Sequence, residues 1–314
     1  MTRYLLGRLG QSAVVLVIVS LVIFALVHLL PGSPAKAELG VRATPQAIAA
    51  FNRLNGFDKP LWVQYWIYVD HLLHGNLGFS YAENAPVTQL FMARLPKSML
   101  LVGLSLVVAV LLAIPLGVYQ AVRRNGIGDY LLTSASFGLY SFPTFWLGFV
   151  LIALLSVSLH IFPPTAPSGN SILSILADWR GLVLPVMTLA LVSVAAFSRY
   201  MRSSMIDALA QDYIRTARAK GLSERAVLVG HALRKSMIPM ATMIGLSLPS
   251  ILGGALVTEQ VYNYPGVGLL FFDAAGRSDF PILLGLTLVG AVGVVVGNLV
   301  ADLAYAVLDP RIRY

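Results

Sequence analysis

The side chains best placed to bind another molecule lie in a basic segment, residues 203–235, between two long apolar runs. Apolar residues recur there with the spacing of one helical stripe, at Ile206, Leu209, Ala210, Tyr213, Ile214 and Ala217. Arg215 and Arg218 lie off that stripe. Gly221 suits the left-handed position just past a helix end, and Ser223 can cap a second helix. We therefore predict a helix–Gly–helix unit that is too polar to enter lipid.

Such a unit has three possible roles. It can dock into a partner protein, bind anionic lipids, or simply carry the positive charge that favours the cytoplasmic side of a membrane. Docking is the most specific hypothesis. The candidate contact residues are Tyr213, Arg215, Thr216, Ala217, Arg218, Lys220, Gly221 and His231.

Catalysis by the chain itself is not indicated. The 314 residues include no cysteine, which excludes thiolate metal sites, iron–sulfur ligation and cysteine nucleophiles. A phosphate-binding loop needs Gly-x4-Gly-Lys followed by Ser or Thr, but neither Lys-Ser pair, at 97–98 and 235–236, follows a glycine. We expect a non-enzymatic chain with no ATP or Mg²⁺ site and no resident metal.

Two carboxylates border apolar runs and are candidates for a path through a membrane. Glu259 follows the fifth run, where we expect it either at the outer mouth of a pore or as a solvated boundary charge. Asp302 lies at the inner end of the last run, four residues after Asn298. A single carboxylate forms no catalytic dyad. A structural hydrogen-bonding role is the simpler interpretation of Asp302, and a proton-coupled secondary transporter that uses it is the alternative function.

The composition shows what kind of molecule must hold these side chains. Hydrophobic residues make up 57% of the chain, charged residues only 11%, and the mean hydropathy is +0.78. Soluble domains carry about 25% charged residues. So few charges could not cover the apolar surface, and the same composition excludes a disordered chain. The net charge of +8 falls between apolar runs, which indicates an integral membrane protein rather than one that binds nucleic acid.

Six runs free of Asp, Glu, Lys and Arg predict six transmembrane helices, at 11–30, 98–121, 131–158, 182–198, 236–258 and 281–301. They do not alternate as barrel strands do, so the expected fold class is an all-α integral membrane protein. The first run has 20 residues, longer than the about 7–15 of a signal peptide, and is expected to be a retained helix. Prolines that can bend helices lie inside four runs, at Pro115, Pro143, Pro185 and Pro249.

The distribution of Lys and Arg predicts the orientation. Eight lie between Arg199 and Lys235, so we place that connection and both termini in the cytoplasm. The chain then divides into an N-terminal transmembrane helix (1–30), an extracytoplasmic insert (31–97) and a core of five transmembrane helices (98–314). In the insert, Thr44-Pro45 opens one helix, and an aromatic-rich run from Leu61 to Val69 indicates another.

Several motifs, in order along nearly the whole chain, resemble the dipeptide/oligopeptide branch of ABC-importer permeases. They lie at Asp58–Tyr65, Gly75–Ser80, Arg215–Arg225, Tyr264–Gly268 and Leu308–Tyr314. The third is similar to the family's cytoplasmic coupling loop. The general loop pattern begins Glu-Ala-Ala, whereas here the matching positions read Arg-Thr-Ala, a departure that the peptide branch shares. The resemblance implies a type I importer permease.

It also implies partners. A second homologous permease, often a different chain, pairs with this one, two ATPase subunits bind ATP and Mg²⁺ below, and an extracytoplasmic binding protein delivers cargo. The coupling helix, around Tyr213 to Gly221, sits in a cleft of the ATPase, and closure of the ATPase pair turns the cavity outward. The expected location is the cell (inner) membrane, in contact with its lipids. Dipeptides or short oligopeptides are the first candidate cargo, with nickel chelates, glutathione and haem as alternatives.

Overall fold

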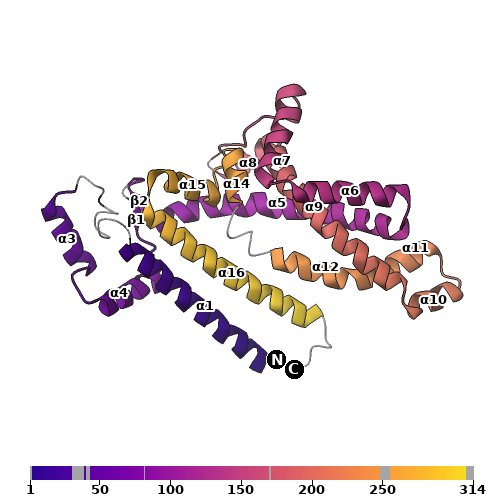
Figure 1. Ribbon diagram of the computed structural model, residues 1–314, viewed down its shortest axis with the longest axis horizontal. Helices are drawn as coiled ribbons and strands as arrows, with labels where there is room; N and C mark the ends of the chain where they lie inside the picture. The colour runs from indigo at the N-terminus through magenta and orange to yellow at the C-terminus, as the bar shows by residue number, and fades with distance from the viewer. Residues whose placement is uncertain are drawn as a thin grey trace.

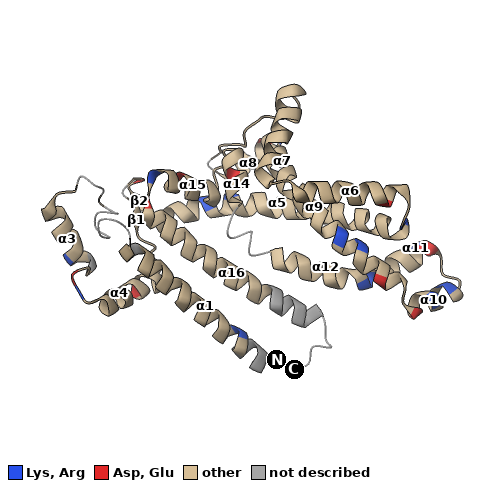
Figure 2. Ribbon diagram, viewed as in Figure 1, with Lys and Arg blue, Asp and Glu red and all other residues tan. Residues whose placement is uncertain are grey.

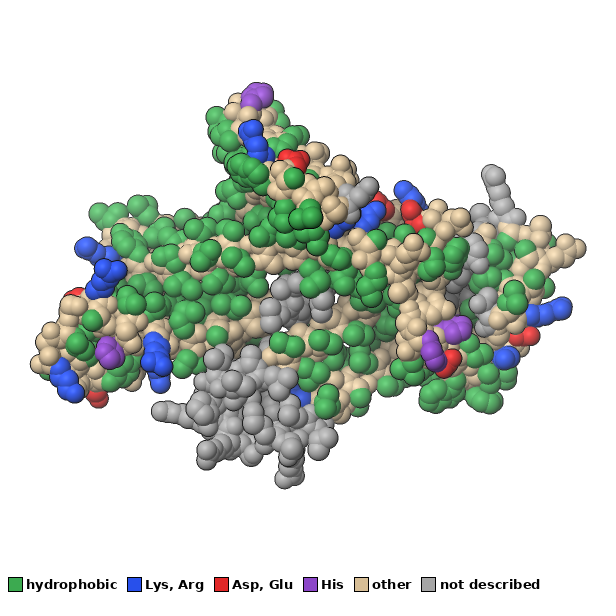
Figure 3. Space-filling model, turned by 180° about the vertical axis from the view of Figure 1, so that it is seen from behind, with side chains coloured by type: hydrophobic (Ala, Val, Ile, Leu, Met, Phe, Trp, Pro, Cys, Tyr) green, Lys and Arg blue, Asp and Glu red, His purple; other side chains and the backbone are tan. Residues whose placement is uncertain are grey.

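The computed structural model describes residues 2–29, 39, 43–80, 82–169, 171–247 and 255–308, and the side chains of 2–6, 27, 55 and 301–308 lie outside this description. Long helices run through the middle of the elongated molecule, with α3 and α4 at one end and α10 and α11 at the other (Figure 1). Hydrophobic side chains dominate that middle, whereas charged ones gather mainly towards the ends and on a projecting segment (Figure 3). This distribution fits a multi-pass membrane protein.

Four helices of the described chain are long and apolar enough to cross a bilayer. They are α1 (Thr2–Leu29), α5 (Val87–Val122), α9 (Trp179–Leu209) and α16 (Phe280–Leu308). They correspond to the first, second, fourth and sixth predicted spans.

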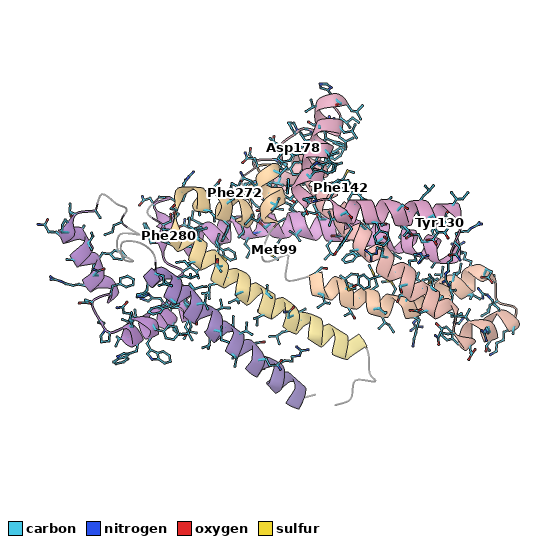
Figure 4. The ribbon with its side chains drawn as sticks, viewed as in Figure 1. Met99, Tyr130, Phe142, Asp178, Phe272 and Phe280 are labelled. Carbon is cyan, nitrogen blue, oxygen red and sulfur yellow. The ribbon has the colours of Figure 1, made fainter. Side chains whose placement is uncertain are left out.

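The third predicted span, 131–158, is not a single straight helix. It consists of α6 (Ile127–Ser141), α7 (Thr144–Leu151) and a π-helix, η1 (Ile152–Ser158), with a bend of 108° between α6 and the rest. The break falls at Phe142-Pro143 (Figure 4). Proline lacks an N–H donor, and its ring disfavours helical geometry at the preceding residue. That residue, Phe142, accordingly adopts an extended ψ of 137°. This span is therefore broken rather than continuous.

The fifth predicted span, 236–258, is described only at its ends. α12 (Arg234–Ser247) covers its first part and α14 (Leu256–Val261) begins near its last residues. Residues 248–254, including Pro249, lie outside the described chain. The prediction of six crossing helices therefore stays a prediction.

Two helices extend well beyond their predicted spans. α5 begins at Val87 instead of residue 98, and α9 continues to Leu209 instead of ending at 198. A charge-free run measures the part of a helix that crosses lipid, whereas long charged side chains at its ends extend into water without ending the helix. The charged positions in Figure 2 accordingly lie towards helix ends.

The centre of the bundle is the close contact between α5 and α9. A Cβ at Gly117 would lie 2.6 Å from the Met201 Cβ and 2.7 Å from the Ser198 carbonyl oxygen, so only glycine permits this approach. The buried residues around it are Ala109, Ala113, Ala190, Val194, Phe197, Met201 and Met240. α9 therefore packs along α5 on its way from the middle of the molecule to the end that carries α10 and α11 (Figure 1).

Short elements complete the fold around the long helices. α3 (Pro45–Asn55) begins as predicted, with Pro45 in its first turn and the Thr44 side chain accepting a hydrogen bond from the Ala47 N–H at 3.2 Å. α4 (Leu61–Leu73) confirms the aromatic-rich helix. β1 (Phe79–Ser80) pairs antiparallel with β2 (Ala85–Pro86), Phe79 opposite Pro86. α8 (Ile172–Ala177) and α15 (Val267–Arg277) are short connecting helices.

Candidate functional site

The basic segment forms a compact projection at the end of the molecule far from α3 and α4 (Figure 1). α10 (Asp212–Ala219) is followed by Gly221 at φ +80°, α11 (Glu224–Ala226) and a π-helix, η2 (Val227–Leu233), that leads into α12. The Ser223 hydroxyl accepts a hydrogen bond from the Ala226 N–H at 3.4 Å. The predicted helix–Gly–helix unit is confirmed. We call residues 212–226 the docking ridge.

The predicted single stripe from Ile206 to Ala217 is divided between two helices. α9 ends at Leu209, Gln211 is extended with ψ 151°, and α10 begins at Asp212. Periodicity alone did not show this break because Ile206 and Leu209 of α9 and Ile214 and Ala217 of α10 all face the same hydrophobic cluster. Asp212 in the first turn complements the positive end of the α10 dipole.

That cluster is the foot of the docking ridge. Ile214 is fully buried and Ala217 is 5% exposed. They pack with residues from the ends of α5, α9 and η2, in a cluster of Ala121, Met205, Ala208, Ile214, Ala217, Val227 and Ala232. The Ser236 hydroxyl adds a hydrogen bond to the Ser204 carbonyl oxygen at 3.1 Å, which joins the start of α12 to α9. The ridge therefore contacts α5 and α9 directly and is linked to α12 through η2 and the Ser236–Ser204 hydrogen bond.

The opposite side of the ridge is polar and exposed. Exposed candidates are Tyr213, Arg215, Thr216, Arg218, Lys220 and Gly221, with His231 exposed on η2. Ala217 differs from them, because it belongs to the buried foot. Its predicted contact with a partner is therefore corrected to an anchoring contact within the chain.

Charges on this face pair with near neighbours. The Arg215 guanidinium lies 3.3 Å from the Asp212 carboxylate, and Arg218 donates to both Glu224 oxygens at 2.8 and 3.2 Å. The Glu224 carboxylate raises the pKa of the Arg218 guanidinium, so this arginine stays charged. Blue and red positions accordingly alternate over α10 and α11 (Figure 2). The exposed face of the ridge is therefore a surface of mixed charge.

Glu259 lies in a different part of the molecule, in α14, beside α15 and away from the docking ridge (Figure 1). Its side chain is fully buried. The Ser98 hydroxyl donates to it at 2.6 Å, and the N–H groups of Gly268 and Leu269, at the start of α15, donate at 2.7 and 3.1 Å. Glu259 is therefore neither a solvated boundary charge nor exposed at a pore mouth in this structure. It anchors the first turn of α15, where a carboxylate is stabilised by the helix dipole.

The motif Tyr264–Gly268 packs around this carboxylate. A Cβ at Gly266 would lie 2.3 Å from Glu259 Oε2, and a Cβ at Gly268 would lie 2.5 Å from the Leu256 Cα. The Tyr264 hydroxyl donates to the Lys97 carbonyl oxygen at 2.7 Å, and burial raises the pKa of Tyr264. We call Glu259, Ser98 and residues 266–269 the outer socket.

The structure describes only the helix that carries the second carboxylate candidate. Asp302 lies on α16, but its side chain is outside the described part of the chain, so its role stays a prediction. Within the described residues, no group of three or more His, Asp or Glu side chains could hold a metal ion.

One connection was missed by the sequence analysis. Asp129, at the start of α6, forms a paired hydrogen bond with Arg202 of α9, 73 residues away. A lone carboxylate beside an apolar run is a visible signal, but its partner cannot be found without the packing of α6 against α9.

The chain is similar to known proteins over its whole length. Residues 113–314 match the family described as binding-protein-dependent transport system inner membrane component, and residues 1–102 match the N-terminal part of such membrane components. The chain is 39% identical to the oligopeptide transport system permease protein AppB of Bacillus subtilis (strain 168), covering 100% of both chains.

Two further relatives extend this similarity. The glutathione transport system permease protein GsiC of Salmonella typhimurium (strain LT2) is 39% identical, with 100% of both chains covered. The dipeptide transport system permease protein DppB of Escherichia coli (strain K12) is 35% identical, with 100% of this chain and 99% of that one covered. The motif resemblance is confirmed.

Proposed function

We propose, from the premise that this chain belongs to the binding-protein-dependent inner-membrane permeases of ABC importers, that it moves short peptides inward and receives the force of ATP hydrolysis through the docking ridge. Membership makes it a translocation subunit that works with ATPase and substrate-binding partners. The relationships do not favour the alternative, a proton-coupled transporter that uses Asp302. In our proposal ATP and Mg²⁺ bind to the ATPase partners, and this chain contributes no catalytic group.

One observation carries the assignment of the ridge. Its apolar side is buried against three helices, whereas its polar side, with Tyr213 39% exposed, faces away from the chain. A loop that served only to carry positive charge would need no such foot. Because Ile214 and Ala217 fix the ridge to α9, a cleft that closes on the ridge would move α9 as well.

The partners follow from this orientation. In our proposal the ridge meets an ATPase in the cytoplasm and both termini lie on that same side. The segment with α3 and α4 would meet the binding protein outside. A second permease, which we propose to be a different homologous chain, would complete the pore. In this proposal residues 31–97 would serve the binding protein, residues 98–314 would provide both the pore and the ridge, and residues 1–30 would add one transmembrane helix.

The proposed cargo rests on what the relatives share. Their names give oligopeptides, dipeptides and glutathione as transported substrates. Glutathione is itself a small peptide, so one chemical class covers all three. Co-purification of the complex with its binding protein, followed by mass spectrometry of the retained ligand, tests this class. A retained nickel chelate or haem would contradict it.

Gly221 offers the sharpest test of docking. No atom lies within 4 Å of a Cβ built at this position. Alanine and tryptophan would both strain the positive φ, but only tryptophan would add bulk to the exposed turn. We expect Gly221→Trp to abolish ATPase association or ATP-driven uptake in proteoliposomes, and Gly221→Ala to retain most of both. If Gly221→Trp assembles and transports like the parent, the docking assignment is wrong.

The energy source separates the two function classes. Uptake into vesicles loaded with ATP, measured without a pH gradient, is expected for the full complex. Uptake that needs a pH gradient and no ATP, and that is lost in Asp302→Asn, would instead support the secondary transporter.

A further inference from the structure

The ion pair between α6 and α9 takes no part in the packing of the docking ridge itself, and its geometry is specific. Arg202 Nε donates to Asp129 Oδ1 at 2.8 Å, and Arg202 Nη2 donates to Oδ2 at 2.7 Å. The Asn125 N–H also donates to Oδ2, at 3.0 Å. Asp129 is only 2% exposed. Two parallel bonds between planar groups fix orientation as well as distance, which one hydrogen bond does not.

The pair is part of a network that includes a third helix. The Thr133 hydroxyl, one turn along α6, donates to Asp129 at 3.3 Å. Gln120, in the last turn of α5, donates its amide N–H to the same hydroxyl at 3.2 Å. The start of α6 is thus fixed to both α5 and α9 by side chains that are largely hidden from solvent.

This network lies directly beside the foot of the docking ridge. Met205 of the foot is three residues after Arg202 on α9, and Ala121 of the foot follows Gln120 on α5. A displacement of Ile214 and its neighbours would therefore load α9 within one turn of Arg202. The load then has a stiff route into α6, because separating the pair would leave the Asp129 carboxylate buried without its counter-ion.

The far end of this route reaches the broken span. Beyond the 108° bend, the Gly148 carbonyl oxygen of α7 accepts a hydrogen bond from the Tyr262 hydroxyl at 3.2 Å. Tyr262 follows α14, the helix that carries Glu259, and its hydroxyl also lies 2.8 Å from the Thr188 hydroxyl of α9. The broken span therefore contacts α9 beside the foot of the ridge through α6, and contacts the segment after Glu259 through α7.

We propose that Asp129 and Arg202 are a positioning pair that makes α6 move together with α9 when the docking ridge is displaced, and so carries that displacement into the broken span α6–α7. The inference rests on the proposed function, since it needs a partner that moves the ridge. It assigns no contact with cargo to either residue.

The ratio of peptide taken up to ATP hydrolysed is the first test. Asp129→Asn keeps the shape but removes the charge, and we expect uptake per ATP to fall about tenfold, within the range of ordinary coupling between sites. Arg202→Lys keeps the charge without the paired bonds, so uptake per ATP should fall less in this variant. The matched control is Asp273→Asn, which makes the same change at an exposed carboxylate on α15 to which no role is assigned, and it should match the parent. Unchanged uptake per ATP in assembled Asp129→Asn would overturn the proposal.

A distance measurement gives a result even if Asp129→Asn fails to assemble. The chain has no cysteine, so spin labels can be attached cleanly at Tyr130→Cys on α6 and Asp207→Cys on α9, both exposed positions. Tyr130 lies on the part of α6 far from the bend (Figure 4). In the parent complex the label-to-label distance should be the same with and without ATP, whereas ATP should change it in Asp129→Asn.

The two hypotheses can fail separately. A parent label distance that changes with ATP, while ATP-driven uptake is normal, would show that the helices do not move together and would overturn only the positioning pair. A parent complex that shows no ATP-driven uptake would remove the proposed function, and the positioning pair with it.

Discussion

The docking ridge and the outer socket use the same kinds of charged and polar groups in opposite ways. Ridge charges pair locally, Arg215 with Asp212 and Arg218 with Glu224, and remain exposed. Glu259 of the socket is fully buried and bonds to Ser98, 161 residues away. An exposed charge keeps its hydration and can exchange partners, whereas a buried carboxylate must keep every donor it has. The charges of the ridge therefore face water, whereas the carboxylate of the socket holds its own chain together.

The largest effect should come from the buried side of the ridge. Ile214→Asp would bury a carboxylate with no donor among apolar side chains, and we expect a loss of more than about 4 kcal/mol in the stability of the ridge on α9. ATPase co-purification should be lost, and limited proteolysis should cut within 212–226. Ile214→Val, expected to cost about 1 kcal/mol, is the control. Normal ATPase binding by Ile214→Asp would show that the foot does not hold the ridge.

A second test addresses the socket. Glu259→Gln keeps the size of the side chain but places an NH₂ group where a carboxylate oxygen now accepts hydrogen bonds. We expect a loss of roughly 3 kcal/mol in stability, because either the Gly268 and Leu269 N–H groups or the Ala255 N–H group must lose its acceptor, whichever way the amide is turned. A lower melting temperature of the detergent-solubilised permease is the measurement. An unchanged melting temperature would mean that Glu259 is not the anchor of α15.

Two glycine substitutions in α15 test the close packing of the socket, and we expect them to have smaller effects. At Gly268 a Cβ would meet the Leu256 backbone at 2.5 Å, so Gly268→Ala should destabilise the protein by about 1–3 kcal/mol. Gly276, in the same helix, has no atom within 4 Å of the position that a Cβ would take, so Gly276→Ala should be neutral or slightly stabilising. Equal melting temperatures for the two variants would contradict the close packing of the socket.

The smallest effect is expected at the exposed ridge pair. Glu224→Gln removes the partner of Arg218, but both side chains are about half exposed, at 65% and 45%. Exposed pairs of this kind contribute little and are screened by salt. The melting temperature should not change measurably at physiological ionic strength. A marked fall would place the pair among the structural contacts rather than on a free surface.

Several features followed from local sequence alone. Apolar runs located α1, α5, α9 and α16, because crossing lipid demands a long hydrophobic stretch wherever the helix finally packs. Gly221 marked the turn of the ridge, because a positive φ is a property of one residue. Asp129 and Arg202 were each visible as charges near apolar runs, but their pairing was not.

The sequence by itself determined the membrane class, the exposed helix–Gly–helix ridge and the family, since hydropathy, periodicity and short motifs are local properties. Only the tertiary structure decided the bend at Phe142-Pro143, the break between α9 and α10, the burial of Glu259 and the pairing of Asp129 with Arg202. Each of these depends on which helices lie side by side. Residues 73 or 161 positions apart meet only after the bundle has packed, and packing also decides whether a charge is solvated or enclosed.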